Sequence, residues 1–343
     1  RDKGVARRET LRQLENGEID ILLGTHALFQ DDVVFHDLAL VVIDEQHRFG
    51  VRQRVALTQK GPKPDLLVMT ATPIPRTLSL TAYGDMDHSR ITEKPPGRKP
   101  VDTRTIPMSR IDDIITGLKR ATANGEQAYW VCPLVEESEF LDLTAAEERF
   151  ETLKMALGDS VGLVHGKMSG PEKDAIMERF YNGEIQVLIA TTVIEVGVNA
   201  PNATIMIIEH AERFGLAQLH QLRGRVGRGD KKSSCILLYK APLGETAKAR
   251  LNVLRDTEDG FLIAEEDLRL RGAGDVLGAA QSGFPRFRLA DIAVHGELLA
   301  AARDDAELIM RRDADLKSER GEALRTLLYL FSRDDAVKLL SAG

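Results

Sequence analysis

The stretch LVVIDEQH, residues 40–47, decides the fold class, because four apolar residues run straight into two adjacent carboxylates. A short apolar run without alternation is typical of a parallel strand that is buried on both faces of its sheet. Further runs of this kind lie at residues 19–23, 66–69, 127–132, 161–164, 186–190, 204–208 and 234–239. Helical patterns fall between them, as at 109–123 and 170–181, and this alternation predicts an α/β fold with parallel sheets.

The segment EKPPGRKPV, residues 93–101, predicts an interlobe linker. Its three prolines and one glycine cannot continue a helix or a central strand. About three strands precede it, so the first lobe is predicted to be partial, whereas the second lobe has five or six strands and is predicted to be complete. Beyond residue 242 the pattern turns helical, with a glycine-rich stretch at 272–283. We therefore expect domains at residues 1–95, 96–241 and 242–343.

The composition excludes several classes of protein. The 46 basic and 53 acidic residues give a net charge of -7, which excludes a chain-wide basic coat but allows local basic patches. The two cysteines, Cys132 and Cys235, lie far apart in apolar runs, which excludes a disulfide framework and favours a reducing compartment. The sequence contains no run of eighteen apolar residues, which is about the length that a membrane-spanning helix needs. The chain starts with Arg1 and has no signal-peptide pattern, so we expect it to be part of a longer protein.

Two polar segments follow strands in the first lobe. Asp44 and Glu45 follow the strand at residues 40–43, where one carboxylate can hold a magnesium ion through water and the next can orient an attacking water. A strand that runs into a charged turn is the structural alternative. The segment TATPIPRT, residues 70–77, offers hydroxyls that could bond to this acidic pair, although a capped helix start explains it better when it is taken alone.

Two further segments lie in the second lobe. In VLIATTVIEVGVN, residues 187–199, hydroxyls after a strand suit phosphate contacts, and ordinary strand-to-helix capping explains them equally well. In QLHQLRGRVGRG, residues 218–229, Arg225 and Arg228 are three residues apart and would share one face if the segment is helical. Two guanidiniums with glycines between them suit the stabilisation of a transferring phosphoryl group, and this interpretation is favoured over a solvated basic helix.

Together the four segments resemble the core of superfamily 2 helicases in order and spacing. The residues within these motifs are most similar to those of the bacterial RecG fork-remodelling helicases, as in DEQHRFGV (44–51) and GLAQLHQLRGRVGR (215–228). The transcription-repair coupling factor is a relative that shares much of this, but Gln46 and YWVCPLVEES (129–138) favour RecG. Residues 261–283 resemble the translocation motif that the two families share.

The resemblance implies two RecA-like lobes, the first partial, followed by a mostly helical translocation region. It also implies ATP and Mg²⁺ as cofactors. Asp44 would coordinate Mg²⁺ through water, Glu45 would activate the attacking water, and Arg228, with Arg225 beside it, would be the charge-stabilising finger. The other residues expected to face the nucleotide are Gln46, His47, Gln221, Gly197 and Asn199, the last of which stands where the family usually has aspartate.

The resemblance further implies a DNA path and a coupling device. The residues expected on the DNA side are Gly24, Thr25, His26, Thr191 and Thr192. Those expected to transmit lobe closure into movement are Arg250, Arg271 and Gln281. The implied partners are branched double-stranded DNA, namely forks and Holliday junctions, and single-stranded-DNA-binding protein. The implied protein is a monomer of the bacterial cytoplasm without a membrane association.

One element of the family pattern is absent from the sequence. No Gly-x-x-x-x-Gly-Lys-Ser/Thr loop occurs in these 343 residues, so no lysine of that motif can hold the terminal phosphates. We therefore predict that the chain by itself does not hydrolyse ATP. Two alternatives stay open: a non-catalytic module that binds DNA or a partner, and a translocase of the coupling-factor type.

Overall fold

The computed structural model describes residues 4–45, 57, 59–71, 87–133, 139–191, 200, 202–271 and 295–331. The chain forms two compact units, Arg1–Pro73 and Ile74–Gly343. Within the described ranges, no helix is both long enough and apolar enough to cross a membrane.

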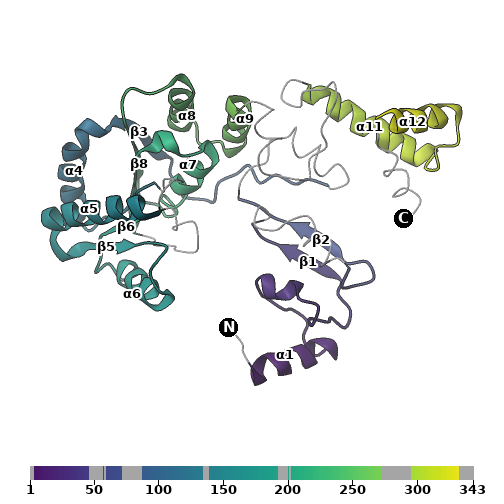
Figure 1. Cartoon of the computed structure of the whole chain (residues 1–343), viewed down its shortest axis with the longest axis horizontal. Helices are drawn as coiled ribbons and strands as arrows, with labels where there is room; N and C mark the ends of the chain where they lie inside the picture. The colour runs from purple at the N-terminus through teal and green to yellow at the C-terminus, as the bar shows by residue number, and fades with distance from the viewer. Residues whose placement is uncertain are drawn as a thin grey trace. The chain divides into compact units, whose positions relative to one another are not determined.

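The first unit contains a parallel pair of strands (Figure 1). β1 (Leu40–Ile43) pairs with β2 (Asp65–Val68), and they follow α1 (Val5–Glu15) and the short 3-10 helix η1 (His26–Phe29). Val41 and Ile43 are buried, whereas Leu40 and Val42 are more than half exposed. The expectation that this strand is covered on both faces is therefore wrong for the described part of the unit, where one face packs around Leu57.

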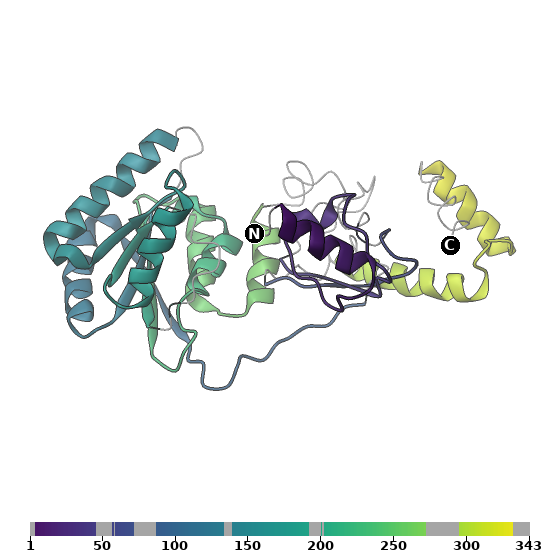
Figure 2. The same ribbon diagram turned by 90° about the horizontal axis from the view of Figure 1, so that it is seen from below.

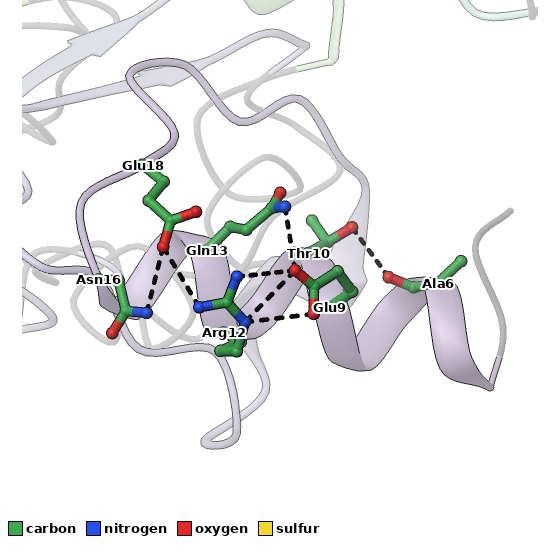
Figure 3. A network of polar contacts seen from close by, with 7 residues as sticks. All are labelled: Ala6, Glu9, Thr10, Arg12, Gln13, Asn16 and Glu18. Atoms are coloured by element: carbon green, nitrogen blue, oxygen red, sulfur yellow. Dashed lines mark hydrogen bonds and ion pairs between the residues drawn. The ribbon is translucent and has the colours of Figure 1, made fainter.

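The predicted strand at residues 19–23 is also wrong. These residues have no strand conformation, and Ile21 and Leu23 are 80% and 90% exposed. A strand requires a hydrogen-bonded neighbour, and in the described part of the first unit β1 and β2 pair with each other alone. The surface of α1 carries an exposed polar network in which Arg12 donates to both Glu9 and Glu18 (Figure 3).

The second unit is built on a six-stranded parallel sheet with the order β3-β8-β7-β4-β6-β5. Its strands are β3 (Val101–Pro107), β4 (Gln127–Val131), β5 (Val161–Val164), β6 (Val187–Ala190), β7 (Ala203–Ile208) and β8 (Ser233–Tyr239). The predicted α/β class with parallel sheets is thus confirmed. β3, with the sequence VDTRTIP, was not among the predicted strands. An edge strand that is half solvated alternates polar and apolar residues and so lacks a continuous apolar run.

Helices cover both faces of this sheet (Figure 2). α4 (Ile111–Ala123) and α5 (Glu139–Leu157) pack on one face, around Trp130 and Ile207. α6 (Gly170–Tyr181), α7 (Leu216–Arg223), α8 (Glu245–Asp256) and α9 (Gly260–Arg271) pack on the other. Successive residues of β4 point to opposite faces, so Tyr129 belongs to one core and Trp130 to the other.

The helix starts follow local sequence rules. α6 begins at Gly170, where the sequence predicted a helix, with a capping box formed by Ser169 and Glu172 and with Pro171 in the first turn. The helical carboxyl-terminal region contains α11 (Gly296–Arg312) and α12 (Glu319–Leu330), and Ser318 caps α12 by accepting a hydrogen bond from the amide of Gly321. The glycine-rich stretch at 272–283 lies outside the described residues.

Candidate functional site

The acidic pair lies at the carboxyl end of β1, where side chains of a parallel sheet reach the ligand crevice. The amide of Glu45 donates to Asp44 Oδ1 at 2.9 Å. Glu45 has a φ of 53°, in the left-handed region that side chains other than glycine rarely adopt. Such strain is often held at functional sites, where it fixes the direction of a side chain. Thr70 follows β2 at the same edge of this sheet, because the two strands are parallel.

At this edge of the sheet a metal ion could be held by a single carboxylate, that of Asp44. Among the described residues, no group of three or more His, Cys, Asp or Glu side chains is placed to hold a metal. Mg²⁺ in phosphate-transfer sites keeps several waters and takes one or two carboxylates plus substrate phosphates. The exposed Asp44, oriented by its bond from Glu45, has the donor chemistry for such an ion.

The arginine segment of the second unit is a turn and not a helix. α7 ends at Arg223, Gly224 caps it, and Gly227 has a φ of 70°. The condition under which Arg225 and Arg228 would share a helix face is therefore not met, because a left-handed residue cannot continue a right-handed helix. Instead the Nε atom of Arg228 donates to the carbonyl of Gly224 at 3.3 Å, so the turn folds back on the end of the helix.

The turn is tight against its neighbours. A Cβ at Gly227 would lie 2.9 Å from a methyl group of Val101, so a side chain fits there neither sterically nor conformationally. Arg228 is exposed and Arg225 is half-buried. Burial raises the pKa of the Tyr129 hydroxyl to about 12, and the positive charges of Arg228 and Arg225 oppose that rise.

The other predicted residues are spread over both units. Gln221 is half-buried on α7, and Thr191 is buried directly after β6. Gly24 precedes η1, where a Cβ would lie 2.7 Å from the side chain of Leu28. Thr25 and His26 cap and begin η1, and Arg271 ends α9. The predicted residues that lie outside the described part of the chain are Gln46, His47, Thr192, Gly197, Asn199 and Gln281.

A buried cation beside the arginine turn was missed. Arg223 is 3% exposed, and its guanidinium donates to the carbonyls of Leu254 and Thr257 at 2.5 and 2.9 Å. Arg250 on α8 makes the reverse connection, donating to the carbonyl of Phe214 just before α7 at 2.9 Å. A buried charge persists only when it is paired or fully hydrogen-bonded. These bonds therefore join α7 to α8 and to the turn that follows α8.

A second buried polar network joins β4, β7 and α5. Glu209 is 6% exposed and accepts hydrogen bonds from Trp130 Nε1 and Arg149 Nε, both at 2.5 Å. The guanidinium of Arg149 also lies over the ring of Trp130, 5.5 Å from its centroid. Burial and the nearby Glu209 carboxylate raise the pKa of the Cys132 thiol, so this cysteine stays protonated at neutral pH. No sequence signal marked this network, because its members are far apart in the chain.

His220 gives the second unit a specific dependence on pH. Its Nδ1 accepts from Arg223 at 3.1 Å, and burial, followed by the charge of Arg223, lowers its pKa from 6.5 to about 4. The unfolded chain binds this proton below pH 6.5 while the folded chain does not, so stability is lost as pH falls from about 6.5 to about 4. A shift of this size corresponds to about 3 kcal/mol.

We therefore expect the acid-induced loss in the free energy of unfolding to be about 3 kcal/mol smaller in His220→Gln than in wild type. Urea unfolding near pH 7 and near pH 4.5 measures it. His88→Gln, which replaces an exposed histidine, is the matched control. Equal pH dependence in wild type and His220→Gln would contradict the assignment.

Comparison with known proteins defines the class first. Residues 2–81 match the family model "DEAD/DEAH box helicase", and residues 108–230 match "Helicase conserved C-terminal domain". A chain of the helicase Lhr of Mycobacterium smegmatis has the same fold, with a TM-score of 0.56 at 16% identity over 75% of this chain and 36% of that chain. The sequence and fold are those of a helicase core.

The particular family follows from closer matches. Residues 257–331 match "ATP-dependent DNA helicase RecG, domain 3, C-terminal". The chain is 56% identical to RecG of Escherichia coli K12 over 298 residues, and 49% identical to RecG of Bacillus subtilis over 339 residues. A structure of RecG bound to a three-way DNA junction superimposes with a TM-score of 0.66 at 44% identity, over 87% of this chain and 38% of that one. The chain belongs to the RecG family.

These matches cover most of this chain but a smaller share of each relative. They include 85% and 98% of this chain but 43% and 50% of the E. coli and B. subtilis proteins. The chain thus spans half or less of the length of these relatives.

Proposed function

We propose that the full-length protein is an ATP-dependent double-stranded-DNA translocase that remodels stalled forks and branch-migrates Holliday junctions. The observation that carries this proposal is the 49% identity to RecG across 98% of the chain. It is supported by an acidic pair at the end of β1 and by two arginines in a glycine-bounded turn after α7. Residues 1–95, 96–241 and 242–343 would then be part of lobe one, lobe two and the translocation region.

We propose the following roles around the nucleotide. Mg²⁺, when it is bound with ATP, neutralises charge on the phosphates. Asp44 would hold that ion through water, and Glu45 would orient the attacking water and receive its proton. Arg228, supported by Arg225, would stabilise the charge that develops on the transferred phosphoryl group. The further residues proposed to contact the nucleotide are Gln46, His47, Gln221, Gly197 and Asn199.

The DNA side and the coupling device are proposed in the same way. Gly24, Thr25, His26, Thr191 and Thr192 would contact the DNA backbone. Arg250, Arg271 and Gln281 would link lobe closure to DNA movement, and the bond from Arg250 to the carbonyl of Phe214 supports a connection between hairpin and lobe. Single-stranded-DNA-binding protein as a partner, a monomeric state and a bacterial cytoplasmic location complete the proposal.

The test compares the full-length gene product with the 343-residue chain. ATP hydrolysis is measured without DNA, with linear duplex and with a three-way junction. We expect the junction to stimulate the full-length protein at least tenfold. We expect no hydrolysis by the 343 residues alone, because they contain no phosphate-binding loop.

Two results would contradict these expectations. One is a full-length protein that no DNA stimulates. The other is hydrolysis by the 343-residue chain that Glu45→Gln abolishes. If the chain alone binds junctions in a salt-dependent manner without hydrolysis, a DNA-binding module is the better description of this part.

A further inference from the structure

The linker between the two lobes contacts the turn that joins α8 and α9. Lys94 Nζ forms an ion pair and hydrogen bond with Glu258 Oε2, although the two residues are 164 positions apart. The other oxygen of the same carboxylate, Oε1, accepts from the backbone amide of Val101, where β3 begins. Upstream, the guanidinium of Arg90 lies 4.9 Å from the ring centroid of Phe261 on α9. The linker therefore contacts the Glu258 carboxylate at both of its ends, and Arg90, upstream of the linker, contacts α9.

The turn that carries Glu258 is rigidly built. The amide of Asp259 donates to Thr257 Oγ1 at 3.1 Å, and Asp259 Oδ1 accepts from the amide of Phe261 at 2.8 Å, which caps α9. On its inner side the carbonyl of Thr257 accepts from the buried Arg223. One short turn thus bonds to α7 through Thr257 and to the linker through Glu258.

The environment of Glu258 favours its charged form. Its side chain is 24% exposed. Burial raises its pKa, but the bonds from Lys94 and from the amide of Val101, together with the charges of Lys94 and Arg223, outweigh burial and bring the pKa below its ordinary value. A partly desolvated, charge-assisted bond of this kind is stronger and more directional than an exposed surface pair.

We propose that Glu258 is a positioning residue that straps the interlobe linker to the helical hairpin, so that the linker moves with α7 and the hairpin during each cycle. This rests on the proposed function and adds a second connection to it. Arg223 joins the hairpin to the helix that precedes the arginine turn, and Glu258 extends that connection to the segment that leads to the first lobe. Loss of the strap would let ATP be hydrolysed without a matching movement of DNA.

The strap itself is tested by limited trypsin digestion of the full-length protein. Arg90 and Arg98 are followed by Ile91 and Lys99, and not by proline, so trypsin can cleave after both. We expect Glu258→Gln to raise the rate of cleavage at these sites at least fivefold. Glu266→Gln, which removes the same charge from α9 where Glu266 pairs with Arg269, should leave the rate unchanged. Unchanged cleavage in Glu258→Gln would overturn the proposal.

Its functional role is tested by the ratio of two rates. In Glu258→Gln we expect junction-stimulated ATP hydrolysis within about twofold of wild type and junction unwinding lowered about tenfold. Lys94→Met should resemble it, and the double variant should be no worse than either single one. A parallel fall of both rates would mean a merely structural residue. If wild type shows no DNA-stimulated hydrolysis, the proposed function fails, while the digestion still decides whether the strap exists.

Discussion

Arg228→Ala in the full-length protein is expected to lower junction-stimulated ATP hydrolysis by about a thousandfold or more, the range that a charge-stabilising arginine contributes in phosphoryl transfer. Arg228 is exposed in the turn after α7, with its Nε atom on the carbonyl of Gly224. That bond holds one edge of the planar guanidinium and so orients the rest of it. Arg228→Lys should also be strongly impaired, because an ammonium lacks this fork geometry. Steady-state hydrolysis at saturating DNA measures both.

The matched control is Lys232→Ala, which removes an exposed positive charge from the same basic segment. Its rate of hydrolysis should stay within about twofold of wild type. Junction affinity should change little in Arg228→Ala, because the loss concerns the transition state. If Arg228→Ala hydrolyses ATP as fast as Lys232→Ala, the finger role passes to Arg225 or to neither arginine.

Glu45→Gln is expected to lower hydrolysis by at least about a hundredfold, which is the usual contribution of a positioned general base. The amide keeps the shape of the side chain but cannot receive the proton of the attacking water. Binding of ATP and of the junction should persist, so the expected signature is a loss in kcat with little change in KM. Single-turnover hydrolysis separates this loss of chemistry from slow product release.

Asp65→Asn provides the control for Glu45→Gln. Asp65 is an exposed carboxylate at the start of β2, which is the opposite end of the same sheet from Glu45. Its replacement removes a charge from the first unit without touching the proposed site. A Glu45→Gln protein with a wild-type kcat would remove Glu45 from the mechanism.

The buried elements of the second unit could be predicted from the sequence. Every residue of β4 and β6 is buried, and all of them except Gln127 are apolar, so the pattern of a strand covered on both faces can be read directly from the sequence. The start of α6 could be predicted equally well, because Ser169, Pro171 and Glu172 act within one turn. Sequence patterns predict buried strands and helix starts well, since both depend on residues that are adjacent in the chain.

The remainder depends on contacts that adjacent residues do not encode. Arg223 lies in a segment of basic residues and would pass for a surface side chain, yet carbonyls 31 and 34 positions away enclose it. The Glu258–Lys94 pair is 164 positions apart. The spacing of Arg225 and Arg228 suggested a helix face, but Gly227 with its positive φ makes a turn. The roles predicted for Gln46, His47, Thr192, Gly197, Asn199 and Gln281 stay predictions.

The packing of α8 and α9 determines where the second unit can be cut for separate study. Leu251, Leu254 and Ile263 belong to the same apolar core as the sheet, and the carbonyls that surround Arg223 come from the end of α8. A recombinant piece that stops near residue 241 would open that core to water and leave a buried guanidinium without its acceptors. Excision, or exchange of parts between relatives, should therefore keep everything through Arg271 with the six-stranded sheet.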